Sequence, residues 1–175
     1  MMSNVRKGLG ILLLSAVVAS TSLPVMAKED RVVDEQLNVS FVPLPYSKTA
    51  QGAKGKPVHY IMTLPDKSVA VYTGSFADKK YGTVPPLEPN EIKTMCTKAQ
   101  TLLGKGFSLK ENKRFLLANR NGAECRFSDA KGRTIHWIGA PVAAHLLFFY
   151  ADWAKTPTTE QVGAFRYLLG GTRVF

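Results

Sequence analysis

The residues best suited to chemistry or to anion binding are an arginine and a histidine on two neighbouring predicted strands. We expect Arg126 and His136 to project from the solvent face of a sheet, where a guanidinium and an imidazole together can bind an anionic group. A strand histidine that binds nothing is the alternative. The pair is therefore a candidate for binding rather than a complete site.

Basic residues are concentrated around this pair. The stretch 98–133 holds nine basic residues against three acidic ones. If its strands are antiparallel, Arg114, Arg126 and Arg133 converge near the exposed side of the sheet and form, with His136, a candidate basic face for an acidic protein or an anionic envelope polymer. A solvated surface that only maintains solubility is the simpler interpretation.

Motifs of catalysis are absent from the sequence. It has no GxSxG nucleophile motif and no HExxH or CxxC metal motif. Glu124 and Asp129 are possible members of a glycosidase carboxylate pair, which requires a defined separation in space. We expect no catalytic residue, metal or cofactor. The alternative is a small periplasmic hydrolase that acts on peptidoglycan or a related envelope polymer and uses His136.

Two irregular stretches are candidate contact loops. Residues 46–57 are rich in polar residues and glycine, and the stretch 74–89 contains an aromatic residue beside two lysines. In the second stretch, Lys79, Lys80 and Tyr81 are the candidate contact residues. Both stretches are equally compatible with plain connections.

The two cysteines predict one disulfide. Cys96 and Cys125 are an even pair in a chain that we expect to be exported, and disulfides form in oxidising compartments. In the chain-entropy model, a bridge across this separation stabilises the fold by about 3.5 kcal/mol. A reactive thiol or a metal ligand is the less common alternative.

The amino-terminal residues have the three regions of a secretory signal peptide. Two basic residues precede an apolar run over 8–20, and a small-residue pattern ends at Ala27. The apolar run is too short for a transmembrane helix. We therefore expect cleavage after Ala27, with 1–27 removed and 28–175 folding as a single periplasmic α+β domain without a membrane span.

The charge of the chain points to anionic partners. It carries 23 basic and 13 acidic residues, a net charge of +10, and removal of the two basic residues in 1–27 leaves about +8. Such a charge raises the association rate with polyanions. In the cell envelope these are lipid head groups, lipopolysaccharide, peptidoglycan carboxylates or an acidic protein, whereas nucleic acid is not expected.

Periodicity and turn signals predict an α+β fold in which one face of an antiparallel sheet of about five strands packs against two to three helices. The disulfide would join the first helix to the sheet. The predicted strands are 37–42, 58–64, 68–73, 113–119, 123–128 and 133–140, and the predicted helices are 90–103, 141–154 and 158–169.

These observations favour binding over catalysis. We expect a noncatalytic periplasmic interaction protein that docks an envelope or secretion-system partner, or that acts as an immunity or inhibitor protein by occupying the cleft of a toxin or hydrolase. An accessory subunit of a pilus or conjugation apparatus would use the same kind of surface. The hydrolase remains the alternative from another class.

Overall fold

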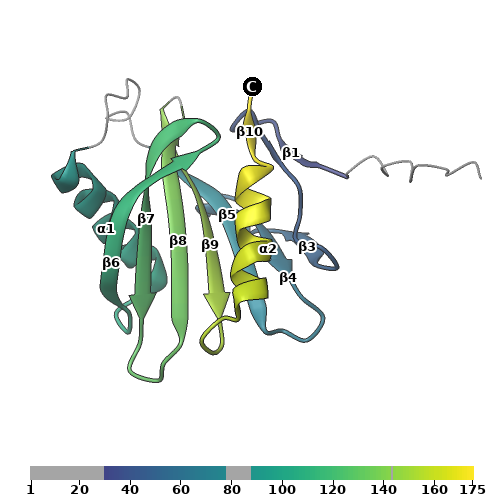
Figure 1. Cartoon of the computed structure of the whole chain (residues 1–175). Helices are drawn as coiled ribbons and strands as arrows, with labels where there is room; N and C mark the ends of the chain where they lie inside the picture. The colour runs from purple at the N-terminus through teal and green to yellow at the C-terminus, as the bar shows by residue number, and fades with distance from the viewer. Residues whose placement is uncertain (1–29, 78–87, 143) are drawn as a thin grey trace, which may run out of the picture.

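The computed structural model describes residues 30–77, 88–142 and 144–175, which form two antiparallel sheets and two helices (Figure 1). The predicted signal peptide and the candidate contact residues Lys79, Lys80 and Tyr81 lie outside these ranges. The α+β class is confirmed, with more strands than predicted.

The large sheet has seven strands in the order β3-β4-β5-β9-β8-β7-β6, and the small sheet has three in the order β1-β2-β10. The large sheet consists of β3 (Lys48–Gln51), β4 (Val58–Thr63), β5 (Val69–Ala77), β9 (His145–Trp153), β8 (Thr134–Val142), β7 (Arg120–Ser128) and β6 (Ser108–Leu117). The small sheet consists of β1 (Val32–Asp34), β2 (Val39–Phe41) and β10 (Arg173–Val174).

Several predicted elements are confirmed. The β4–β5 and β7–β8 hairpins have the predicted turns. The strand β6 begins five residues before the predicted strand 113–119, and residues 120–122, predicted as the turn that follows it, belong to β7. The first helix is α1 (Pro89–Leu103), whose cap is Glu88 in a capping box with Glu91 rather than Asn90. The last helix is α2 (Thr159–Gly170), which begins with the expected capping box of Thr158 and Gln161.

The predicted helix over 141–154 is wrong. This stretch forms the end of β8 and the whole of β9, which lies between β5 and β8 in the middle of the sheet. Successive residues of β9 pack on opposite sides: Phe149 contributes to one core cluster and Phe148 to the other. Because both sides of β9 are buried, its sequence is almost continuously apolar and also satisfies a helical spacing.

The two helices cover different faces of the large sheet, whereas we expected them on one face. The buried face of α1 packs with Phe127, Ile135 and Trp137, which point to one side of the strands. The opposite side packs against α2 through Phe165 and against the small sheet. Figure 1 shows α2 in front of the large sheet and α1 behind β6 and β7.

The disulfide between Cys96 and Cys125 is confirmed and links α1 to β7. Both residues are fully buried in the core between the helix and the sheet. A bridge of this kind persists in oxidising compartments, which agrees with an exported protein. Among the described residues, no helix combines the length and apolar character needed to cross a membrane.

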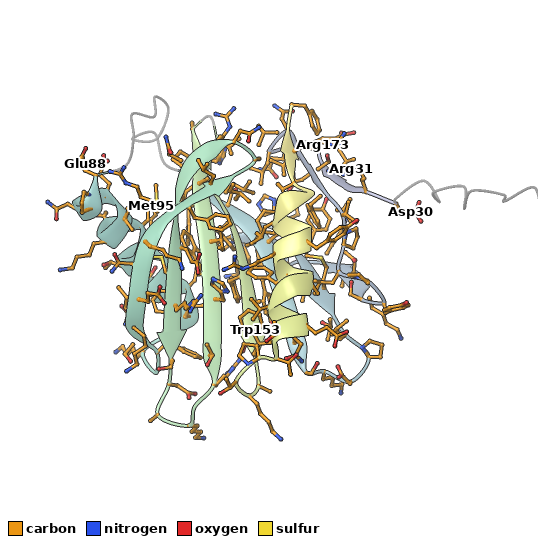
Figure 2. The ribbon with its side chains drawn as sticks, viewed as in Figure 1. Asp30, Arg31, Glu88, Met95, Trp153 and Arg173 are labelled. Atoms are coloured by element: carbon orange, nitrogen blue, oxygen red, sulfur yellow. A yellow bond between two sulfur atoms is a disulfide. The ribbon has the colours of Figure 1, made fainter. Side chains whose placement is uncertain are left out.

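The small sheet is held beside the large one by side-chain contacts as well as by its core. The Arg31 guanidinium donates hydrogen bonds to the carbonyl groups of Ser40 and Gly171, and so joins β2 to the end of α2. Figure 2 labels Arg31 and Arg173 at this junction, beside the carboxyl end of α2. Separate hydrogen bonds, from His59 to Asp34 and from Tyr60 to Val33, hold β1 near the start of β4.

Candidate functional site

The four residues of the predicted basic face are divided between opposite faces of the large sheet. Directly paired residues on neighbouring strands share a face. Arg126 pairs with His136, on the side covered by α2, whereas Arg114 pairs with Ala123, which packs on the α1 side. The expected convergence does not occur, because the strand register places the side chains of Arg114 and Arg126 on opposite faces of the sheet.

His136 is buried, not exposed as predicted. Its side chain is 4% exposed and packs against Trp153 and Phe165, because α2 covers this face of the sheet. Its Nε2 lies 2.8 Å from Oε1 of Glu124. A buried, paired imidazole has no free access to a polymer substrate, so the structure gives no support to His136 as the base of a hydrolase.

Glu124 is a buried carboxylate at the centre of a charge cluster whose lysine and arginine reach the surface. Its side chain is 2% exposed, and Lys113 and Arg126 approach it at 3.4 and 3.2 Å. Burial raises the pKa of this carboxyl, but the hydrogen bond from His136 and the positive charges of His136, Lys113 and Arg126 together lower the pKa to about 2. The cluster neutralises Arg126 internally, which leaves it little charge for a partner.

Arg133 is also neutralised within the chain. Its guanidinium forms a two-pronged ion pair with the carboxylate of Asp152 and lies over the ring of Phe107. The hydrogen bond to Asp152 and its charge raise the pKa of Arg133, against the effect of partial burial. Of the predicted basic face, Arg114 alone has no ion pair with the part of the chain that the structure describes.

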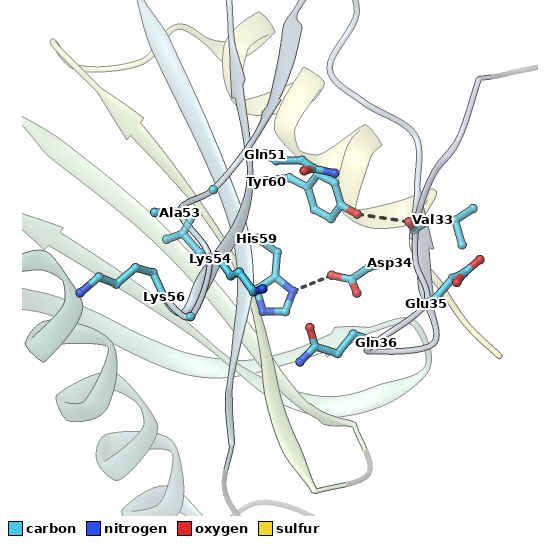
Figure 3. A pocket seen from close by; sticks show the side chains of 13 residues that line it. Val33, Asp34, Glu35, Gln36, Gln51, Ala53, Lys54, Lys56, His59 and Tyr60 are labelled. Atoms are coloured by element: carbon cyan, nitrogen blue, oxygen red, sulfur yellow. Dashed lines mark hydrogen bonds and ion pairs between the residues drawn. The ribbon is translucent and has the colours of Figure 1, made fainter.

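A cavity of about 580 Å³ lies at the other end of the large sheet, between β1 and the β3–β4 hairpin. One wall is formed by residues 33–36 at the end of β1. The opposite wall is formed by residues 51–56 and by the first residues of β4. Figure 3 shows Asp34, Gln36, His59 and Lys54 pointing into the space between the walls, whereas Val33, Glu35 and Lys56 point away from it.

A histidine and an aspartate meet in this cavity. Nδ1 of His59 lies 2.7 Å from Oδ2 of Asp34, and Oδ1 of Asp34 accepts a hydrogen bond from the backbone N–H of Leu37 (Figure 3). Since a carboxylate accepts, Nδ1 of His59 is the donor. This hydrogen bond therefore holds the imidazole in one orientation, and Nε2 is the ring nitrogen that it does not use.

The fold explains how these two residues meet. A register shift between Val58 and Tyr60 changes the alternation at the start of β4, so that Val58 packs on the α1 side and Tyr60 on the side of the small sheet. The hydroxyl of Tyr60 donates a hydrogen bond to the carbonyl of Val33 at 3.3 Å. In a regular strand Val58 and Tyr60 would share a face, and the register shift separates them.

Lys54 and Lys56 supply positive charge to the cavity wall. Both are exposed, and neither forms an ion pair with any residue in the described ranges. On the opposite wall, Asp34 is engaged by His59, and Glu35 is the other acidic residue of the lining. The cavity therefore carries two cations that internal pairs do not neutralise, in contrast to Arg126 and Arg133.

Sequence reasoning missed this cavity. Asp34 and His59 are 25 positions apart and belong to different sheets, so no motif spacing links them. The sequence feature that could have indicated the cavity is the polar, glycine-containing stretch 46–57. We predicted it as a loop, but it also contains β3. No group of three or more His, Cys, Asp or Glu residues that could hold a metal ion occurs among the described residues.

Comparisons with known proteins show a similarity of fold. The chain matches no family model and no curated protein. The solution structure of cyanobacterial PsbP (CyanoP) from Synechocystis sp. matches with a TM-score of 0.64 and 9% identity, over 88% of this chain and 98% of that chain. A crystal structure from Bacteroides thetaiotaomicron matches with a TM-score of 0.48 and 8% identity, over 85% of this chain and 49% of that chain. The chain thus has a fold similar to that of cyanobacterial PsbP.

Proposed function

We propose that this protein is an exported, noncatalytic periplasmic interaction protein that binds an acidic envelope protein or an anionic envelope polymer. The signal-peptide pattern of residues 1–27 and the Cys96–Cys125 disulfide support the compartment. The net charge of about +8 that remains without residues 1–27 supports an anionic partner. An envelope or secretion-system component and the acidic cleft of a toxin or hydrolase both fit this description.

The observation that carries the proposal is the cavity between β1 and the β3–β4 hairpin. Its wall presents Lys54 and Lys56 beside a histidine held in place by Asp34. Cations without internal partners contribute more to binding an external anion than cations that already form ion pairs. The contact surface is therefore assigned to the cavity in place of the predicted basic face.

A capture experiment tests the proposal. The tagged protein is crosslinked in its native envelope, purified, and its bound proteins and polymers are identified by mass spectrometry. Lys54→Glu with Lys56→Glu removes the positive wall, and we expect loss of the captured component. The matched control is Lys105→Glu with Lys131→Glu, two exposed lysines near the opposite ends of the strands, which should leave capture unchanged.

Equal capture by both double variants contradicts the assignment of the cavity. Capture lost in the control but kept in the cavity variant would place the contact surface near the β7–β8 turn instead. Both double variants change the net charge by the same amount, so a general electrostatic effect is separated from a local one.

Hydrolysis of an envelope polymer is the second candidate, and one observation favours it. His59 is oriented by Asp34 and lines an open cavity, as a general base must be. The test is hydrolysis of purified peptidoglycan by the protein and by His59→Ala. Activity that is abolished by His59→Ala would replace the binding proposal with a hydrolase, whereas no activity in the unaltered protein removes this candidate.

A further inference from the structure

A second cavity adjoins the first one. It has a volume of about 300 Å³, and part of its lining also lines the cavity beside β1: Gln36, Gly55, Lys56 and His59. Its remaining walls come from residues next to β4, the end of β5 and the start of β9. Because the walls are shared, the two cavities meet at His59 and form one elongated depression, which we call the His59 groove.

The polar groups of the His59 groove are suited to a carboxylate. His59 uses Nδ1 within the protein, its Nε2 donates to a carboxylate ligand when the ring is protonated, and Lys54 and Lys56 provide ammonium groups. Ser75, 8% exposed, and His145 are further polar residues of the lining of the second cavity. Charge-assisted hydrogen bonds from such donors are among the stronger contacts that a carboxylate makes.

One ring nitrogen beside the second cavity lacks a partner. Nδ1 of His145 is buried and has no hydrogen bond to the part of the chain that is described. Buried polar atoms are rarely left unpaired, and the exceptions often occur at functional sites. His145 shares this property with Trp137 and Trp153, whose indole nitrogens are also buried without a partner among the described residues.

An unpaired strand edge lies next to the groove. β3 is the terminal strand of the large sheet and pairs with β4, so its other edge has no partner among the described strands. All four of its residues are exposed, and the last, Gln51, lines the first cavity. Extended peptides bind to such edges through backbone hydrogen bonds, which a glycan chain cannot form in the same register.

From these features we infer that the His59 groove binds an acidic segment of a partner protein in an extended conformation. The backbone of the segment pairs with β3, and one of its carboxylates lies beside His59 and Lys54 (Figure 3). Charge complementarity and the free edge select this occupant. The inference rests on the proposed function, whose partner class it narrows to an acidic peptide.

Defined probes test the inference on the purified protein. The first is an acetylated and amidated heptapeptide of alternating Thr and Glu, the second has Gln in place of Glu, and the third is the first peptide with alternate backbone nitrogens methylated. By fluorescence anisotropy, we expect the Glu peptide to bind at least about tenfold more tightly than either of the others. His59→Gln and the double variant Lys54→Glu/Lys56→Glu should each weaken binding about tenfold, whereas Lys105→Glu/Lys131→Glu should not.

The outcomes separate this inference from the proposed function. Equal binding of the methylated and unmethylated peptides overturns the pairing with β3. An oligogalacturonate that binds through His59 and the lysines, while the Glu peptide does not bind, overturns the peptide but keeps an anionic partner. If none of these probes binds, and the cavity variant captures the envelope component as well as the unaltered protein does, then both the inference and the proposed function are overturned. Because Lys54 and Lys56 are exposed, their variant stays informative even if His59→Gln does not fold.

Discussion

At the scale of single residues, the two His–carboxylate pairs of this protein have different environments. His136 and Glu124 are both buried beneath α2, where lysine and arginine complete the charge balance. His59 and Asp34 line an open cavity, and the His59 side chain is 17% exposed. The first pair is structural, because its atoms are enclosed, and the second can contact a ligand.

The orientation of His59 depends on Asp34. Replacing Asp34 by Asn removes the carboxylate that accepts from Nδ1 and from the Leu37 N–H, and we expect a loss of about 1–3 kcal/mol of unfolding free energy. Nitrogen NMR of the imidazole should show Nδ1–H in neutral His59 and a mixture of tautomers in the variant. Glu35→Gln is the control, and a neutral His59 protonated on Nε2 in the unaltered protein would contradict the assignment.

Glu124 makes the fold sensitive to acid. Its pKa is about 2 in the folded protein, below the ordinary 4.5, so its ionised form stabilises the fold above about pH 4.5, and this contribution is lost as the pH falls towards 2. Glu124→Gln should cost about 1–3 kcal/mol at pH 7 and little near pH 2, as measured by urea unfolding.

The control for this effect is Glu111→Gln. Glu111 pairs with Lys113 and Arg126 but is 45% exposed, so its loss should cost no more than about 1 kcal/mol at pH 7. A Glu124→Gln cost that is as large at pH 2 as at pH 7 would show that charge is not the source of the stabilisation.

At the scale of elements, β9 shows why part of the fold escaped prediction. Its apolar residues satisfy a helical spacing, and a strand covered on both sides has no polar alternation to reveal it. Pro141 is suited to the start of a helix, but it lies in β8. There it follows Gly139, which is the last β8 residue paired with β7. The hairpins, by contrast, were predicted because their turn residues act locally.

Glycines in β8 and in α2 should respond in opposite ways to alanine. A Cβ at Gly139 would lie 2.1 Å from the ring of the fully buried Trp137, so Gly139→Ala should destabilise the protein by about 1–3 kcal/mol. A Cβ at Gly163 meets nothing within 4 Å, and Gly163→Ala should stabilise it by about 0.4–1 kcal/mol. Thermal unfolding of both variants checks this, and a neutral Gly139→Ala would show that Trp137 has room to move.

At the scale of the whole molecule, the basic side chains differ in whether a carboxylate of the protein already pairs with them. Arg126 and Arg133 have carboxylate partners within the sheet, whereas Lys54 and Lys56 have none among the described residues. The composition alone predicted an anionic partner but could not place it, because internal ion pairs depend on the register and on the contact between two sheets. The disulfide was predictable, since two cysteines permit one pairing.

Site-specific photocrosslinking in the native envelope tests the central claim most directly. A photoreactive residue replaces either Gln51, on the wall of the first cavity, or Lys105, in the turn between α1 and β6. We predict one discrete adduct from position 51 that disappears when Lys54 and Lys56 are changed to Glu, and none from position 105. An adduct from position 105 alone, or one from position 51 that survives the charge reversal, would contradict the cavity as the interaction site.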